Sequence, residues 1–317
     1  MATSDSNERT QSGEAIGQPQ QKEPDLATIS GLVPLFHQEA KDEEIKGDIA
    51  KHVALLAEKH DVSGYKILLL YGDGADISDR HSNLVYQGAT ADPQGLDILL
   101  ILYSGGGRIE PAYLISKTCK RMAKSKFVVA VPRKAKSAAT LIALGADEIH
   151  MGLMSELGPI DPQIGGFPTL GIRNALNVLA DLSCKYPGCS EMIRKYLAEK
   201  LDLSVLGYLE RVSESAVQYA ERLLSGKTLP EGSSPYSLAD HFVNYYKDHG
   251  FVIDVDEATG LLGSGIVRQK TKEYAFANAV HSSLLVFSVL FNFFRKQEFD
   301  YVGSVQDGLT ITKKEEE

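Results

Sequence analysis

Four short apolar runs alternate along the chain with longer segments in which apolar residues recur at helical spacing. The runs are YKILLLY (65–71), LDILLILY (96–103), KFVVAV (126–131) and DEIHM (147–151). Continuous apolar runs of this length are typical of strands buried on both faces, with crossover helices between parallel neighbours. The pattern therefore predicts an α/β fold built on a crossover-connected, mostly parallel sheet.

The pattern changes after Thr169, where helical spacing continues without intervening strands. Three helices are expected, in IRNALNVLADLSCKY, SEMIRKYLAEKL and VLGYLERVSESAVQYAERLLSG, with Gly226 ending the third. Residues 280–294 form a fifteen-residue apolar run, shorter than the roughly twenty residues that span a bilayer. This run is predicted to be a buried strand pair or a helix docked on a partner, and a subunit interface is a further alternative. No transmembrane segment is expected.

A glycine-rich turn follows the strand predicted at 96–103, in the sequence Ser104-Gly105-Gly106-Gly107. Consecutive glycines mark a backbone with unusual angles or one that lies against a ligand. A helix is expected next, so the turn exposes unpaired N–H groups that suit a phosphate or an oxyanion. A dinucleotide fingerprint would need a glycine where Glu110 stands, which leaves the oxyanion interpretation.

Ser137 lies in a second turn from strand to helix, between KFVVAV and the helix predicted in ATLIALGA. A serine in such a turn exposes its Oγ at the open edge of a sheet, and small neighbours such as Ala138 and Ala139 leave the backbone N–H groups approachable. The alternative is an ordinary N-cap, because serine also accepts hydrogen bonds from the first N–H groups of a helix. Ser137 is therefore a candidate nucleophile or a cap.

The two turns, with the motifs LIALGADEI (141–149) and LGPIDPQ (157–163), resemble the Clp/crotonase superfamily of peptidases. Within it, the chain is similar to the serine dehydrogenase proteinase family, a relative of signal peptide peptidase A, from about Val62 to about Gly263. The resemblance implies a Clp/crotonase-like α/β fold with stacked parallel β-sheet crossovers and a helical C-terminal portion. The sequence departs from the family pattern at two positions. Gly105 replaces the proline of the usual threonine-proline-glycine-glycine loop, and Ala139 replaces a glycine.

The activity that the resemblance implies is that of a serine endopeptidase acting on peptide or protein substrates, in a homo-oligomer. Ser137 would attack the peptide carbonyl, and the N–H groups of Gly107 and Ala138 would hold the oxyanion. Clp proteases carry their histidine near the position of Ile160 or Asp161, where this chain has none. Two alternatives stay open: a scaffold protein that keeps the fold with weak or no catalysis, and an acyl-CoA enzyme on the same fold.

The general base is the least defined part of this site. Signal peptide peptidases use a lysine, and Lys185, 48 residues after Ser137, has the most comparable separation. Lys195 and Lys200 lie in a helix with charges on an alternating face, where a solvated lysine is usual. Asp161 would orient the base or bind substrate, although Asp-Pro pairs also occur as simple turns. Two histidines, His150 in a strand and His249 before a glycine, are expected to be structural.

Composition limits the other classes of function. The net charge is −9 with no basic stripe, which argues against a nucleic-acid partner. Asp73, Asp76 and Asp79 lack the glycine and glutamate of a calcium loop, and three scattered cysteines make no zinc site, so neither a metal nor a cofactor is expected. Few cysteines and no export signal indicate a reducing, cytoplasmic location. The predicted organisation is a disordered lead-in (1–26), a peptidase domain (27–265) and a C-terminal extension (266–317).

Overall fold

A seven-stranded sheet forms the centre of the computed structural model, which describes residues 25, 30, 31, 33, 41–72, 74, 76–91, 95–164, 167–305 and 308–313. The strand order is β11-β10-β1-β2-β3-β5-β9. The strands are β1 (Tyr65–Tyr71), β2 (Asp97–Tyr103), β3 (Phe127–Ala130), β5 (Glu148–His150), β9 (Val267–Arg268), β10 (Gln297–Ser304) and β11 (Leu309–Lys313). Neighbours from β1 to β9 are parallel, whereas β10 and β11 extend the β1 edge in antiparallel fashion. The predicted crossover-connected sheet is confirmed.

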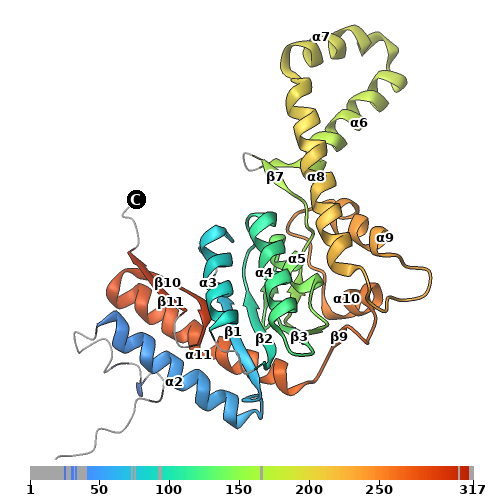
Figure 1. Cartoon of the computed structure of the whole chain (residues 1–317). Coiled ribbons are helices and arrows are strands. Elements are labelled where there is room, and N and C mark those ends of the chain that lie inside the picture. Colours follow the sequence, from blue (N-terminus) through green and yellow to red (C-terminus); the bar gives the residue numbers. More distant parts are fainter. Residues whose placement is uncertain are drawn as a thin grey trace, which may run out of the picture.

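Helices cover both faces of this sheet (Figure 1). One face packs against α2 (Asp42–Lys59) and α11 (Lys272–Arg295), and the other against α3 (Asp79–Thr90), α4 (Ile109–Met122) and α5 (Ala138–Leu144). In β2, Ile98, Leu100 and Leu102 face the second group, while Leu99 and Ile101 face the first. Because successive side chains of a strand point to opposite faces, a strand covered on both needs an apolar residue at every position.

A second, smaller layer of extended segments lies beyond the carboxyl ends of β2 and β3. It contains the parallel pair β4 (Lys134–Ala135) and β6 (Glu156–Leu157), flanked by single bridges from Ser104 to Ala135 and from Leu157 to Ile253. Four segments that are distant in sequence are thus held side by side by backbone hydrogen bonds. Both turns singled out in the sequence emerge from this layer.

Three helices form an arm that projects from the sheet (Figure 1). The strands β7 (Gln163–Ile164) and β8 (Phe167–Pro168) lead into α6 (Thr169–Lys185), the short turn η1 (Pro187–Cys189), α7 (Ser190–Lys200) and α8 (Leu203–Leu224). Only the second half of α8 joins the core, where Ala216, Ala220 and Leu224 are fully buried. The three predicted helices are confirmed, and Gly226, with φ of 81°, follows the end of α8.

The chain then returns to the sheet through α9 (Pro235–Asp240), η2 (His241–Tyr245) and α10 (Val255–Leu262). Residues 266–313, predicted as an extension, contribute β9, β10 and β11 to the same sheet, and α11 from this segment packs on it. The run 280–294 lies within α11, so the strand-pair interpretation is wrong. The helix buries Phe276, Phe287 and Phe291 against the sheet. The lead-in predicted for 1–26 lies outside the described residues, except for Asp25.

The helix α11 is long and apolar enough to cross a membrane by length and composition. In the structure, however, 44% of its most apolar eighteen-residue window is buried inside the protein. One side of this helix therefore belongs to the core of the described chain, which accounts for much of its apolar character.

Candidate active site

Ser137 connects β4 to α5 in a strained backbone conformation, with φ of 50° and ψ of −118°. A positive φ at a residue other than glycine costs on the order of 1–3 kcal/mol and persists only where the surroundings impose it. The side chain is half-buried and makes no capping hydrogen bond to α5. Ser137 thus occupies the N-cap position of α5, but its hydroxyl does not cap the helix, and its backbone forms a sharp strand-to-helix turn.

The segment that carries Ser137 is held from both sides. The small layer fixes Ala135 between Ser104 and Leu157. One turn into α5, the buried hydroxyl of Thr140 accepts the N–H of Gly158 (3.0 Å) and donates to the carbonyl of Ala135 (2.7 Å) or Gly158 (2.8 Å). This network opposes relaxation of the strained turn.

The glycine turn packs directly against Ser137. A Cβ at Gly106 would lie 2.8 Å from Cβ of Ser137 and 3.4 Å from the nitrogen of Ala138. Gly106 and Gly107 adopt φ of 117° and 140°, and a Cβ at Gly107 would lie 2.2 Å from the nitrogen of Ile77. Only glycine suits both positions, because they combine a left-handed backbone with close contact.

Ile77 clamps the turn with two backbone hydrogen bonds. Its N–H donates to the carbonyl of Gly106 (2.8 Å), and its carbonyl accepts the N–H of Arg108 (2.9 Å). Within the described part of the chain, the N–H groups of Gly107 and Ala138 make no hydrogen bond. Two backbone donors beside a serine hydroxyl form an arrangement that can stabilise an oxyanion. Nothing in the sequence marks Ile77 for this role, since its contribution is made by its backbone.

The three candidate lysines all lie on the projecting arm. Lys185 ends α6, is exposed, and has its ammonium 5.4 Å from the centre of the Tyr186 ring. Lys195 and Lys200 are exposed on α7, and Lys195 lies 3.9 Å from Glu191. Since α6 and α7 stand away from the sheet, the fold of one chain does not bring these lysines to Ser137 (Figure 1).

Lys136, directly before Ser137, is a residue that the sequence analysis missed. Its ammonium donates to the carbonyl of Phe251 (3.0 Å) and lies 3.1 Å from Glu156. It thereby ties the loop before α10 to the segment that carries Ser137. Asp161 lies nearby in sequence after β6 and is buried, with 3% of its surface exposed.

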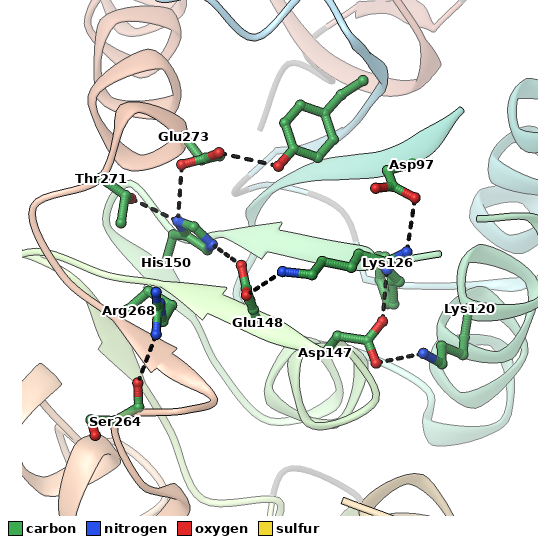
Figure 2. A network of polar contacts seen from close by, with 12 residues as sticks. Asp97, Lys120, Lys126, Asp147, Glu148, His150, Ser264, Arg268, Thr271 and Glu273 are labelled. Atoms are coloured by element: carbon green, nitrogen blue, oxygen red, sulfur yellow. Dashed lines mark hydrogen bonds and ion pairs between the residues drawn. The ribbon is translucent and has the colours of Figure 1, made fainter. Parts of the chain in front are cut away.

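His150 lies in a separate polar network at the start of α11, shown in Figure 2. Its Nδ1 is 2.6 Å from the hydroxyl of Thr271 and 3.4 Å from Glu273, and its Nε2 is 3.3 Å from Glu148. Burial lowers the pKa of His150, although the two carboxylates oppose this effect. The predicted alternation with Glu148 is present, and the contacts are those of a structural histidine.

His249 is followed in the chain by Gly250. The carbonyl oxygen of Gly250 lies 3.4 Å from the ammonium of Lys136. Its Nδ1 is buried and has no hydrogen-bond partner in the described structure. A buried ring nitrogen without a partner is uncommon and marks His249 as a second candidate in proton transfer.

Among the described residues, no group of three or more His, Cys, Asp or Glu side chains is arranged to hold a metal ion. Asp73, the first residue of the weak calcium-like pattern, lies outside the described residues. Burial raises the pKa of the Cys119 thiol to about 12, so this cysteine is a poor nucleophile.

Comparison with known proteins finds similarity in the part of the chain that holds this site. The family model described as "ClpP-like SDH-type serine proteinase" matches residues 75–182. Two curated relatives from Methanocaldococcus jannaschii are similar: uncharacterized protein MJ1495 is 35% identical over 99 residues, and uncharacterized protein MJ0137 is 37% identical over 100 residues. These matches cover 31% and 32% of this chain and 34% and 35% of the relatives. The chain thus aligns with about a third of the length of each.

The solved structures to which the chain is similar are more distant in sequence. ClpP1 from Listeria monocytogenes has 14% identity and a TM-score of 0.40, over 69% of this chain and 99% of its own. A mutant of 1510-N, a membrane-bound stomatin-specific protease, in complex with a substrate peptide has 15% identity and a TM-score of 0.42, over 79% and 89%. The predicted α/β architecture, with a mostly parallel sheet and a helical C-terminal portion, is confirmed by the structure of the chain itself. Residues 75–182, which hold both the glycine turn and Ser137, are therefore similar to the ClpP-like SDH-type serine proteinase family.

Proposed function

We propose that this chain is a serine endopeptidase in which Ser137 is the nucleophile and the N–H groups of Gly107 and Ala138 form the oxyanion hole. The observation that carries the proposal is the conformation of Ser137, strained at φ of 50° without the compensation of a cap hydrogen bond. Strain of this kind is retained where a particular side-chain direction is required. The adjacent glycine turn supplies the N–H of Gly107, and the start of α5 supplies the N–H of Ala138.

In the proposed reaction, Oγ of Ser137 forms a bond to the peptide carbonyl carbon while its proton passes to a base. The carbonyl oxygen becomes negative and accepts hydrogen bonds from Gly107 and Ala138. The C–N bond then breaks, the amine leaves with the proton from the base, and water hydrolyses the acyl-enzyme by the same steps. Loss of one such donor typically lowers kcat about 10²- to 10³-fold.

A lysine base remains our proposal, with Lys185 as its first candidate and Asp161 as the buried group that orients it or binds substrate. Because Lys185 lies on the projecting arm, a second copy of the chain is the natural source of this lysine. Chains with Ser137→Ala and with Lys185→Ala should then be inactive alone and regain part of the activity when they are mixed, since mixed assemblies contain some complete sites. Lys117→Ala, at an exposed lysine of α4 outside the arm, is the matched control.

The arm also supports the proposed homo-oligomer. Its exposed surface carries large apolar side chains whose exposed fractions range from 39% to 65%: Val178, Leu182, Tyr186, Met192, Tyr196 and Tyr208. Exposed apolar groups of this number on one projection are typical of a protein interface. We therefore propose that the arm contacts neighbouring copies.

The experiment for the proposed function is labelling with a fluorophosphonate probe, which phosphonylates an activated serine. The native chain should be labelled, and Ser137→Ala should not. If both are labelled equally, Ser137 is not the nucleophile. Absence of labelling in the native assembly would favour the second candidate, a scaffold that retains the fold. That candidate is supported by one observation: no described side chain makes a hydrogen bond with Oγ of Ser137.

If labelling succeeds but the mixing experiment fails and Lys185→Ala keeps full activity, the lysine assignment is wrong. His249→Ala then tests the imidazole whose Nδ1 is buried without a partner in the described structure. A loss of peptide hydrolysis with retained folding would make His249 the base, and its retention would leave Asp161 to be tested by Asp161→Asn.

A further inference from the structure

The hydroxyl of Ser104 sits directly behind the glycine turn. Ser104 ends the extended run of β2 and has only 2% of its surface exposed. Its Oγ accepts the N–H of Gly106 at 3.1 Å, a bond between residues i and i+2 that closes a local turn. Its own backbone is fixed on the neighbouring segment: the Ser104 N–H donates to the carbonyl of Lys134 (3.1 Å), and its carbonyl accepts the N–H of Lys136 (3.1 Å). The hydroxyl is therefore a rigid anchor.

Both backbone polar groups of Gly106, its N–H and its carbonyl, are thus hydrogen-bonded. Ser104 holds its N–H, and Ile77 holds its carbonyl at 2.8 Å. In a trans peptide, the carbonyl of one residue and the N–H of the next point in opposite directions. Fixing the Gly106 carbonyl on Ile77 consequently turns the N–H of Gly107 away from Ile77. Without the Ser104 bond, the Gly106 backbone gains the freedom that glycine has at positive φ.

The composition of the turn explains why such an anchor is needed. Gly105 stands where the loops that this chain resembles have a proline, so the turn lacks a ring that would restrict its backbone. Three glycines in succession lose more conformational entropy on ordering than any other tripeptide. A buried hydrogen bond from the residue before them restores order locally.

We propose that Ser104 is a positioning residue whose hydroxyl locks the glycine turn, so that the N–H of Gly107 is directed at the oxyanion formed at Ser137. This inference rests on the proposed peptidase function for its catalytic consequence. The locking itself is a property of the folded chain and can be measured without catalysis.

The test compares Ser104→Ala with Ser104→Thr, which keeps a hydroxyl and is the residue found in the loops that this chain resembles. With the full-length assembly, we expect the rate of fluorophosphonate labelling and kcat for a peptide to fall about 10- to 100-fold in Ser104→Ala, with KM nearly unchanged, because the donor is loosened rather than removed. Ser104→Thr should regain most of the loss. An alanine variant that labels at the native rate overturns the proposal.

A second variant separates rigidity from other effects of the hydroxyl. Gly105 is exposed and is not among the positive-φ glycines, and its N–H makes no hydrogen bond in the described structure, so a proline there removes no hydrogen bond. In Ser104→Ala/Gly105→Pro, the ring should restore labelling to near the native rate. A folded double variant that stays as slow as Ser104→Ala contradicts a role in restricting the turn.

Amide hydrogen exchange at Gly106 provides the readout that does not depend on activity. We expect exchange of this N–H to accelerate in Ser104→Ala and to remain slow in Ser104→Thr, while the amide of Ile77 changes less. Unchanged exchange at Gly106 overturns the locking role whether or not the chain is a peptidase. A native chain that fails to react with the probe refutes only the proposed function, because the exchange result still decides the role of Ser104.

Discussion

At the scale of single residues, the site depends on how closely the glycine turn approaches its neighbours. Gly107→Ala should lower the labelling rate of Ser137 about 10²- to 10³-fold, since a Cβ there would lie 2.2 Å from the nitrogen of Ile77 and would displace an oxyanion donor. Gly232→Ala is the matched control, because Gly232 has φ of 81° but a Cβ added there would meet no other atom within 4 Å. It carries the strain of a positive φ without the steric conflict.

The measurement is the second-order rate constant for the probe, with thermal unfolding recorded for each variant. Both variants should lose about 1 kcal/mol or more of stability from backbone strain, but only Gly107→Ala should lose reactivity. Equal reactivity of the two variants would exclude the N–H of Gly107 from the oxyanion hole.

Sequence patterns identify the site residues whose residue type is itself unusual at a strand end. They miss residues that act through backbone atoms or whose position depends on the tertiary fold. Ser137 and the Gly105–Gly107 turn stand out because small residues and glycines interrupt apolar runs at strand ends. Ile77 carries no signal, since it acts through backbone atoms that every residue has. The base is not identified by spacing, because a separation of 48 residues from Ser137 to Lys185 says nothing about whether the arm folds back or projects.

At the scale of elements, the arm is the part of the described chain with the least packing of its own. In α7 only Ile193 is buried, whereas Met192 and Tyr196 are 65% and 57% exposed on the same side of the helix. The double variant Met192→Glu/Tyr196→Glu should therefore dissociate the proposed oligomer by placing charges in an apolar contact. Light scattering after size-exclusion chromatography measures the mass.

Leu55→Glu is the control for this prediction, because Leu55 is 57% exposed on α2, outside the arm. It should leave the mass of the assembly unchanged. If the arm variant keeps the native mass, the arm is not the interface. If it becomes a folded monomer that has lost its reactivity with the probe, the result also supports the contribution of a lysine from a neighbouring copy.

The elements that the sequence predicts are those in which apolar residues follow one clear pattern, either an unbroken run or helical spacing. The central strands follow from unbroken apolar runs, and α6 to α8 from helical spacing. By contrast, β10 (QEFDYVGS) mixes charged and apolar residues because it lies near the sheet edge, and it gives no continuous run. The run 280–294 is apolar around most of the helix, so its period does not separate helix from strand, and only its packing on the sheet resolves the ambiguity.

At the scale of the whole molecule, buried histidines make stability depend on pH. Burial is the largest cause that lowers the pKa of each of five described histidines: His52, His81, His150, His241 and His281. For His281 the pKa falls to about 4, with the nearby charge of Arg133 adding to the effect. Its Nδ1 lies 3.1 Å from the hydroxyl of Tyr71, a buried contact that suits the neutral ring.

The sign of this dependence follows from proton binding. At a pH well above 6.5, the ordinary pKa of histidine, these rings are neutral in both states and contribute no slope. As the pH falls, the unfolded chain binds protons that the folded chain does not, so the free energy of unfolding decreases. For His281 this loss continues until the pH reaches about 4, its pKa in the folded state. Each such ring contributes at most about 1.4 kcal/mol per pH unit.

Urea unfolding between pH 7.5 and 4.5 should therefore show falling stability, with a smaller slope in His281→Gln than in the native chain. Glutamine keeps an oxygen that can accept the hydrogen bond of Tyr71 but does not titrate, so the variant isolates the proton-binding contribution from the packing contribution. Carboxylates elsewhere titrate equally in both chains and cancel in the difference. An unchanged slope would mean that His281 is protonated at the same pH in the folded and unfolded chains, and that the contact with Tyr71 does not favour the neutral ring.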